Sequence, residues 1–198
     1  MKKNKQAFDV SCIIMASGAS TRFGDNKLLA DFHGRTLVER VLDQIPFDLF
    51  KEVILVTRYI EIRELAKNYP VVCILHDFPR QRDTIRVGME HITNTKGCML
   101  VTCDQPLRTI DSLRKMYHMF NQHPTSVVRL GYHDLVGNPV LFPNRYYEEL
   151  KNLMPGQRGL DVIKAHKENI VIVQANNKYE LADVDTPYDL MNLLNIPD

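Results

Sequence analysis

Short apolar runs alternate with amphipathic stretches along almost the whole chain, and this alternation limits the folds open to it more than any other feature. Several runs consist almost entirely of valine, isoleucine and leucine, which is typical of strands buried on both faces of a parallel sheet. The pattern predicts strands at 10–16, 52–57, 71–75, 98–102, 125–130, 136–142 and 169–174. Turn residues on both sides of the 136–142 run favour an antiparallel strand there.

Helical patterns separate most of these runs. A helix is expected to begin near Thr36, because apolar residues recur after it at helical spacing. Thr186 and Pro187 are a typical N-cap and first helical residue. Further helices are predicted at 60–68, 84–93, 110–122, 146–154 and 159–166. The sequence therefore predicts an α/β fold of three layers, α/β/α, built around a mostly parallel sheet.

The length of the chain is that of one domain. Its 198 residues can bury a substantial core, and no repeat, low-complexity segment or Pro/Ser-rich linker divides them. We expect a single domain over 1–198, with residues 1–9 as a flexible N-terminus.

Charge and cysteine content limit the compartment and the partners. A formal net charge of +1 gives no broad field that would attract a nucleic-acid backbone or an anionic membrane. No apolar run is long enough for a signal peptide or a membrane span. The four cysteines form no CxxC pair, so neither a disulfide framework nor a zinc site is expected. We therefore predict a cytoplasmic protein with no nucleic-acid or membrane partner.

The segment after the first predicted strand has the composition of an anion-binding loop. Gly18 and Ser20 let the backbone approach a ligand closely, so that successive N–H groups can face an anion. Arg22 adds a forked donor and Lys27 a compact positive charge, a pair suited to a triphosphate. The glycine spacing fits neither a P-loop nor a dinucleotide-binding fingerprint. The alternative interpretation is an ordinary turn at the surface of an α/β domain.

Carboxylates follow one buried strand and precede the last predicted helix. Asp104 comes two residues after the predicted strand 98–102, and ligands of open α/β sheets lie at the carboxyl ends of the strands. Asp183 and Asp185 would share one face of an extended segment. Because Mg²⁺ is usually held by one or two carboxylates with substrate phosphates, we favour Asp104 and Asp185 as its ligands. Alternatively, Asp104 caps the turn after it, and one of the other two acids serves the N-terminus of the last helix.

A basic segment at 80–88 opens another predicted helix. A helix N-terminus with nearby arginines can hold an anion or hydrogen-bond a nucleobase. A solvated basic loop is the alternative interpretation of the same residues.

Taken together, these segments resemble the MobA-like nucleotidyltransferases, most closely the molybdenum cofactor cytidylyltransferases. The run from Met15 to Leu29 follows the family's opening signature, which is approximately L-A-A-G-x-S-x-R-M-G-x-x-K-L-L. Later segments that match family motifs are Asp104-Gln105-Pro106, Gly137-Asn138-Pro139, 156–159 and 183–187. The resemblance extends over about 10–194. Departures from the family pattern are Ser17, Phe23, Cys103, Gln157 and Leu160-Asp161, of which the last two concern the acceptor.

This resemblance implies a Rossmann-like domain of the nucleotide-diphospho-sugar transferase type. It also implies transfer of CMP from CTP to the phosphate of molybdopterin, with release of pyrophosphate. Arg22, Lys27 and Asp104 would be catalytic: Arg22 on the pyrophosphate, Lys27 at the α-phosphate, and Asp104 with Asp185 on Mg²⁺. The implied nucleotide-binding residues are Ala16, Ser17, Gly18, Arg22, Lys27, Thr84 and Gly88. The implied acceptor-binding residues are Gly137, Asn138, Pro139, Gly156 and Gly159.

Several other activities stay open at this point. The nucleotide could be GTP, and the acceptor could be a sugar or polyol phosphate. An NAD(P)H-dependent oxidoreductase and a non-catalytic protein that delivers cofactor are alternatives of a different class, although neither needs a pair of Mg²⁺ ligands. In the main interpretation the product serves the maturation of molybdenum hydroxylases, whose apoenzyme is then a partner. The sequence leaves the choice between Asp183 and Asp185 undecided.

Overall fold

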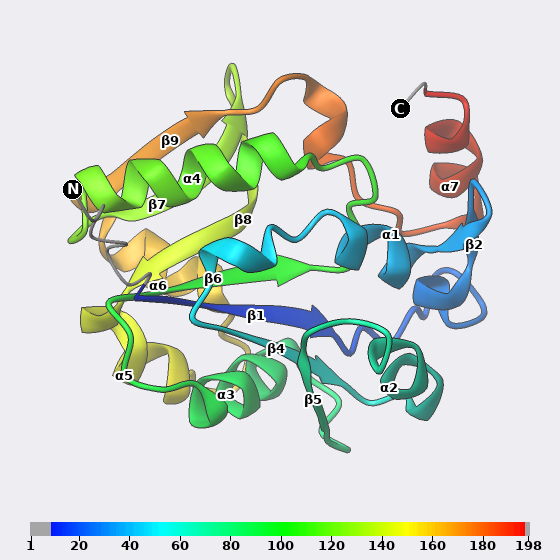
Figure 1. Cartoon of the computed structure of the whole chain (residues 1–198), viewed down its shortest axis with the longest axis horizontal. Helices are drawn as coiled ribbons and strands as arrows, with labels where there is room; N and C mark the ends of the chain where they lie inside the picture. The colour runs from blue at the N-terminus through cyan, green and yellow to red at the C-terminus, as the bar shows by residue number, and fades with distance from the viewer. Residues whose placement is uncertain (1–8, 197–198) are drawn as a thin grey trace, which may run out of the picture.

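A seven-stranded sheet forms the centre of the molecule, with its strands in the order β5-β4-β1-β6-β8-β7-β9 (Figure 1). The computed structural model describes residues 9–196, so the predicted flexible N-terminus lies outside the described residues except for Asp9. The carbonyl of Asp9 accepts a hydrogen bond from the Lys96 N–H at 2.8 Å. The strands are β1 (Val10–Ala16), β4 (Glu52–Thr57), β5 (Val72–Leu75), β6 (Gly97–Thr102), β7 (Val127–Tyr132), β8 (Leu135–Pro143) and β9 (Ile170–Gln174).

The strand directions confirm a mostly parallel sheet. β1 pairs in parallel with β4 and β6, β4 with β5, and β7 with β9. β8 runs antiparallel to both of its neighbours, β6 and β7, as predicted for the 136–142 run. Every predicted strand is present, with bounds that differ by one or two residues at most, and the predicted three-layer α/β/α class is confirmed.

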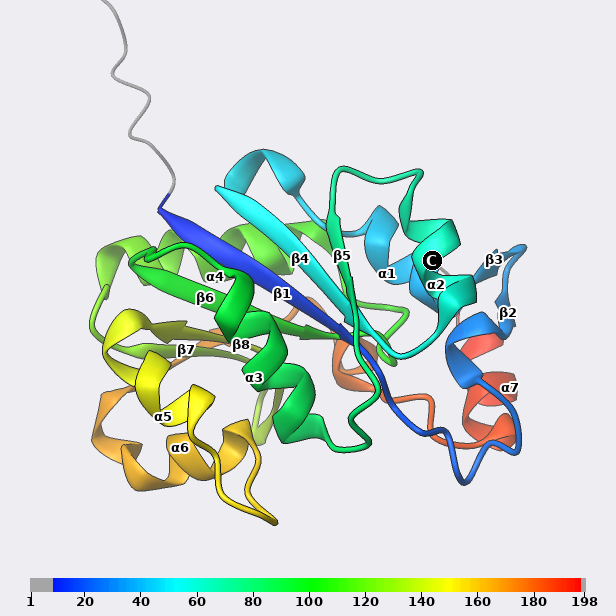
Figure 2. The ribbon, with the colours of Figure 1, turned by 90° about the horizontal axis from the view of Figure 1, so that it is seen from below.

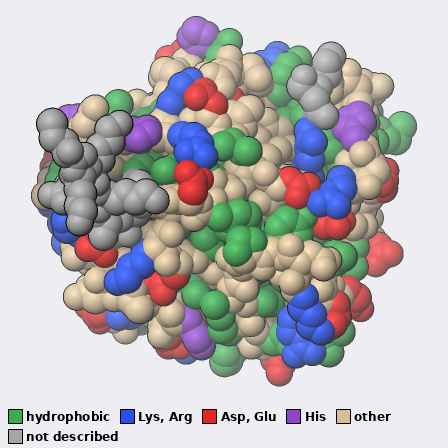
Figure 3. Space-filling model, in the orientation of Figure 1, with side chains coloured by type: hydrophobic (Ala, Val, Ile, Leu, Met, Phe, Trp, Pro, Cys, Tyr) green, Lys and Arg blue, Asp and Glu red, His purple; other side chains and the backbone are tan. Residues whose placement is uncertain are grey.

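Helices cover both faces of this sheet (Figures 1 and 2). Residues of α1 (Leu37–Asp43) and α4 (Ile110–Gln122) pack on one face, and residues of α3 (Gln81–His91), α5 (Tyr147–Lys151) and α6 (Gly159–Ala165) on the other. α2 (Ile60–Ala66) follows β4. No helix between residues 9 and 196 combines the length and the apolar character needed to cross a membrane. Positive and negative side chains are interspersed over the face drawn in Figure 3.

The structure shifts the start of one helix that lies near the site. α3 begins at Gln81, three residues before the predicted start at Thr84. The carbonyl of Arg80 accepts hydrogen bonds from the N–H groups of Asp83 and Thr84, at 3.0 and 3.3 Å, and thereby extends the first turn. The basic segment 80–88 therefore opens a helix, as predicted, and the alternative of a solvated basic loop does not hold for residues 81–88.

A small third cluster holds the C-terminal segment at the carboxyl end of β1 and β6. α7 (Pro187–Leu194) packs there with the hairpin of β2 (Asp31–Phe32) and β3 (Arg35–Thr36), through a core that includes Phe32, Val184 and Leu193. This hairpin was not predicted from the sequence, because two-residue strands show no alternation. Its turn uses positive φ angles at His33 (55°) and Gly34 (77°), as a tight hairpin turn requires.

The N-terminus of α7 corrects one expectation. Thr186 is the N-cap as predicted, and its hydroxyl accepts a hydrogen bond from the Asp189 N–H at 3.2 Å. The Asp189 carboxylate in turn accepts the Thr186 N–H at 2.7 Å. Asp189 therefore serves this helix end, and Asp183 and Asp185 are both left for other roles.

Candidate functional site

The loop after β1 turns Lys27 inward. Ser20 adopts a positive φ of 51°, and its hydroxyl accepts a hydrogen bond from the Lys27 N–H at 3.2 Å. Asn26 caps the short 3-10 helix Lys27–Leu29 by accepting the Leu28 N–H, also at 3.2 Å. Only 8 % of the Lys27 side chain is exposed. The small polar residues thus fix a loop from which a long cationic side chain reaches the carboxyl edge of the sheet.

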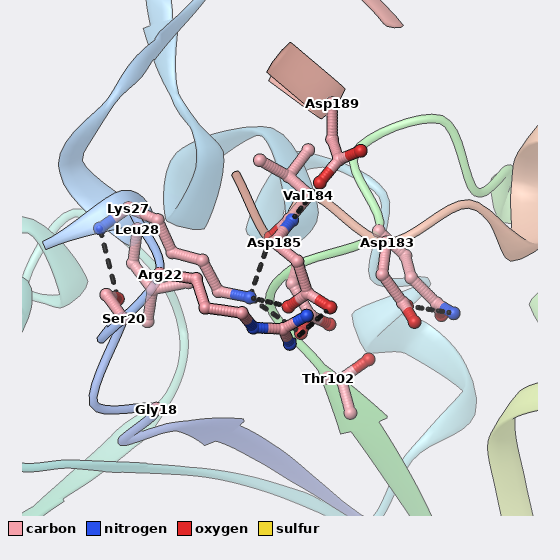
Figure 4. Close-up of polar contacts among 12 residues, drawn as sticks. Gly18, Ser20, Arg22, Lys27, Leu28, Thr102, Asp183, Val184, Asp185 and Asp189 are labelled. Carbon is pink, nitrogen blue, oxygen red and sulfur yellow. Dashed lines mark hydrogen bonds and ion pairs between the residues drawn. The ribbon is translucent and has the colours of Figure 1, made fainter. Parts of the chain in front are cut away.

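The Lys27 ammonium joins three segments that are distant in sequence (Figure 4). Its Nζ donates to the carbonyl of Val184 at 2.7 Å, and to Asp104 Oδ2 and Asp185 Oδ1 at 3.1 Å each. A main-chain bond from the Val184 N–H to the Asp104 carbonyl, 2.8 Å long, holds the two acidic segments together. Burial alone would lower the pKa of Lys27, but the charges and hydrogen bonds of Asp104 and Asp185 outweigh it and raise that pKa. The structure therefore brings the predicted Asp104–Asp185 pair together around a charged lysine.

Arg22 lies at the solvent side of the same group. Its Nη2 contacts Asp185 Oδ2 at 2.7 Å, while 68 % of the Arg22 side chain is exposed. An exposed ion pair of this kind typically contributes about 0–1 kcal/mol. The guanidinium can therefore leave Asp185 for a stronger anion, such as a polyphosphate, at little cost.

Asp183 points to a different partner. Its Oδ1 accepts a hydrogen bond from Gln105 Nε2 at 2.9 Å (Figure 4). Burial, together with the negative charge of Asp104, raises the pKa of Asp183 to about 6. The structure thus separates the two acids of the 183–187 motif, with Asp185 at the lysine and Asp183 at a glutamine.

The donor set fits a divalent cation that also binds phosphate. Asp104 Oδ1 has no hydrogen-bond partner in the described structure, although it is buried, so this carboxylate keeps free lone pairs. Within residues 9–196 no group of three or more His, Cys, Asp or Glu side chains is arranged to hold a metal by itself. Asp104 and Asp185 would thus share Mg²⁺ with substrate oxygens, which is how this ion is commonly held.

A second buried cation near Asp104 was missed by the sequence analysis. Arg108 is 1 % exposed, and within the described part of the chain its Nη1 makes only a long contact of 3.5 Å with the Thr102 carbonyl. Burial lowers the pKa of Arg108, and the charge of Asp104 is among the groups that oppose this effect. Its place two residues after the Asp104-Gln105-Pro106 motif was the one available signal.

A cavity of about 320 Å³ lies between the lysine loop and the start of α3. Its walls contain Gln81 and Thr102, which the sequence analysis did not select. The predicted site residues that line it are Ser17, Gly18, Arg22, Lys27, Thr84, Asp104 and Asp185. Polar groups and cations of this kind around one cavity suit a nucleoside triphosphate.

Ser17, which lines this cavity, contacts a buried histidine, His76, that was not predicted from the sequence. The Phe78 N–H donates to His76 Nδ1 at 3.2 Å, so a neutral ring carries its proton on Nε2. Nε2 lies 2.8 Å from Ser17 Oγ, which donates to the Val56 carbonyl at 3.1 Å. Burial lowers the pKa of His76, which agrees with a neutral ring. Ser17 is therefore held in one orientation beside the cavity.

Two predicted nucleotide-binding residues do not line the cavity. Ala16 is fully buried, and its carbonyl accepts the Thr57 hydroxyl at 2.8 Å. Gly88 faces the sheet, and a Cβ built on it would lie 2.7 Å from Ile13 Cγ2. The structure therefore gives Gly88 a packing role, since it allows α3 to approach β1 closely.

Gly88→Ala is expected to lower the free energy of unfolding by about 1 kcal/mol, as overpacking against Ile13 exceeds the gain in helix propensity. The KM for nucleotide should not change. Gly18→Ala is the matched control, because Gly18 lines the cavity and a Cβ there has nothing within 4 Å. It should alter nucleotide KM and leave stability unchanged, as measured by urea unfolding and steady-state kinetics. Equal KM changes in both variants would contradict the assignment.

A second cavity, of about 250 Å³, adjoins the first and shares Met15 and Gln81 with it. The predicted acceptor residues that line it are Gly137, Asn138 and Gly159. Pro139 and Gly156 do not line it, and Gly156 lies in an exposed turn with a φ of 88°. Two arginines in this cavity, Arg129 and Arg158, were not selected from the sequence.

The chain has the nucleotide-diphospho-sugar transferase fold, with a cavity at the carboxyl edge of its sheet. The chain matches the family model described as "MobA-like NTP transferase domain" over residues 12–170. It belongs to that family and is a nucleotidyltransferase.

Curated relatives agree with this assignment, and solved structures share the fold. The chain is 27% identical over 191 residues, 94% of this chain and 90% of the relative, to a "Probable molybdenum cofactor guanylyltransferase" of Aquifex aeolicus. It is 26% identical over 189 residues, 92% of this chain and 94% of the relative, to the "Molybdenum cofactor cytidylyltransferase" of Escherichia coli. The structure of Rv0371c from Mycobacterium tuberculosis covers 96% of this chain and 100% of its own, with a TM-score of 0.80 and 22% identity. A manganese complex of Rv0371c gives a TM-score of 0.74 at 20% identity, with the same coverage of 96% and 100%.

Proposed function

We propose that this nucleotidyltransferase transfers CMP from CTP to the phosphate of molybdopterin and releases pyrophosphate. The observation that carries the proposal is the Lys27 ammonium, held between Asp104 and Asp185 beside the nucleotide-sized cavity. The names of the Escherichia coli and Aquifex aeolicus relatives support molybdopterin as the acceptor. The product would serve a molybdenum hydroxylase apoenzyme, and we keep the predicted cytoplasmic location.

The chain's own residues would act mainly by positioning and neutralising charge, as is general for transfers at phosphorus. Arg22 would turn from Asp185 to the β- and γ-phosphates and stabilise the leaving pyrophosphate. Lys27 would neutralise charge that develops at the α-phosphate. Mg²⁺ bound by Asp104 and Asp185 would supply a template and a Lewis acid for the two phosphates. Manganese in the related Rv0371c structure supports a divalent ion in this role.

The choice of CTP rests on the resemblance of the Lys27-Leu28-Leu29 and Asp104-Gln105-Pro106 segments to the cytidylyl branch. GTP is the alternative, because the two relatives named above have nearly the same identity and different nucleotides in their names. We infer that Ser17, fixed by His76, presents its polar groups to the edge of the base.

Pyrophosphate release with molybdopterin and either CTP or GTP, with and without Mg²⁺, tests the proposal. We expect Mg²⁺-dependent release with CTP at a kcat/KM at least about tenfold above that with GTP. Preference for GTP would refute the choice of nucleotide alone. Turnover of a sugar or polyol phosphate in place of molybdopterin would refute the acceptor. Absence of release with every pair would refute both.

A further inference from the structure

The second cavity places a cation beside part of the buried apolar core, in a wall that also includes the polar side chains of Gln81 and Asn138. Arg129 lies on β7 two residues after Val127 and directly opposite Val140 of β8, both of which belong to the buried apolar core on that sheet face. A charged residue in such a row loses solvation, and burial indeed lowers the pKa of Arg129. An arginine at this position therefore lowers the stability of the protein unless a ligand pairs with its charge.

Few groups of the described chain compensate the charge and the hydrogen-bond donors of Arg129. Its Nη2 makes one long contact, 3.4 Å, with the Gly137 carbonyl, and its buried Nε has no hydrogen-bond partner. Between residues 9 and 196 no carboxylate forms an ion pair with it. Arg129 is half-buried, and buried polar nitrogens normally have a hydrogen-bond partner, so its guanidinium is available to an acceptor from outside the protein.

The rest of the cavity wall indicates what that acceptor is attached to. The floor is apolar, with Leu100, Phe142 and Ile163 among its residues, and Arg158 adds a second cation at the N-terminal end of α6. The side chain of Arg158 makes no ion pair in the described structure. An apolar floor with two guanidinium groups suits a flat apolar or heteroaromatic body that carries a negative group.

We infer that Arg129, assisted by Arg158, selects acceptors that carry a second anionic group on a flat apolar or heteroaromatic body, apart from the phosphate that receives the nucleotide. This inference rests on the proposed nucleotidyl transfer and specifies its acceptor. The first cavity would hold the nucleotide and the reacting phosphate, and the adjoining second cavity would hold the other end of the acceptor. Arg129 is then a specificity-determining residue.

Kinetics of Arg129→Met with molybdopterin test the inference in the full chain. We expect the KM for molybdopterin to rise about 10- to 100-fold, as for loss of a charge-assisted hydrogen bond, while kcat and the KM for nucleotide stay unchanged. Arg129→Lys keeps the charge but loses the fork, and should give a smaller increase. Arg114→Met is the matched control, because Arg114 pairs with Asp48 on the surface and lines neither cavity. An unchanged molybdopterin KM in Arg129→Met would overturn the inference and leave the transfer reaction standing.

A binding experiment that does not depend on turnover separates the two proposals. Fluorescence titration with pterin-6-carboxylate should give a dissociation constant about 10- to 100-fold higher for Arg129→Met than for wild type. Uncharged pterin should bind both proteins alike. If molybdopterin is not turned over but this difference is found, the acceptor of the proposed function fails and the anion site stands. Equal binding of the carboxylate by both folded proteins would refute the anion site.

Discussion

Lys27→Met is expected to lower kcat for nucleotidyl transfer by about 10²–10³-fold, the usual effect of removing one preorganised charge contact to a transition state. The ammonium is nearly buried and is held at fixed distances from Asp104 and Asp185, so no other cation can easily take its place. The methionine side chain keeps much of the volume and leaves the 3-10 turn intact. Pyrophosphate release at saturating nucleotide, acceptor and Mg²⁺ measures the effect.

Stability must be followed in the same variant. Without the lysine, Asp104 and Asp185 repel each other, so the melting temperature should fall and Mg²⁺ should restore part of the loss. Lys115→Met is the matched control, because Lys115 is an exposed lysine of α4 that pairs with Asp111. It should have wild-type kcat. A folded Lys27→Met protein with kcat within threefold of the control would exclude Lys27 from the chemistry.

The sequence predicted the sheet well because its strands are buried on both faces and therefore read as apolar runs. The antiparallel direction of β8 was also predicted, from the turn residues on both sides of this strand. The β2–β3 hairpin could not be predicted in this way, since it is too short to show a period. Gly88 was assigned to the nucleotide because a sequence does not say which way a helical residue faces. In the structure it faces Ile13.

The candidate site was predictable at positions where a charged residue in a motif has few possible roles. A lysine after a small-residue loop and an aspartate after a buried strand both reach the carboxyl edge of the sheet, as expected. The division between Asp183 and Asp185 depends on Val184, whose burial under α7 and whose bond to the Asp104 carbonyl fix the chain between them. Arg129 and His76 were not predicted as site residues, because their surroundings are formed by segments distant in sequence.

Asp104→Asn is expected to lower kcat by about 10²–10³-fold as well, and in addition to weaken the binding of divalent metal. An amide has no charge to offer a cation and would lose the ion pair with Lys27. Asp185→Asn should weaken metal binding in the same direction, because Asp185 is the second carboxylate at the lysine. Titration of the nucleotide-bound protein with Mn²⁺, followed by the loss of the free-ion EPR signal, measures metal affinity independently of turnover.

Asp183→Asn is the matched control for both carboxylates. Its side chain is bonded to Gln105, and an asparagine oxygen can still accept that hydrogen bond, so kcat and Mn²⁺ affinity should stay within threefold of wild type. The pKa of Asp183 is raised from 3.8 in the unfolded chain to about 6 in the folded protein, so the protonated carboxyl favours the folded state. This contribution to stability is fully present below pH 3.8 and is lost as the pH rises through 6. Asp183→Asn should therefore raise the melting temperature at pH 8 and not at pH 4. If instead Asp183→Asn weakens Mn²⁺ binding and Asp185→Asn does not, the metal pair is Asp104 with Asp183, and Asp185 serves only to hold Arg22 and Lys27.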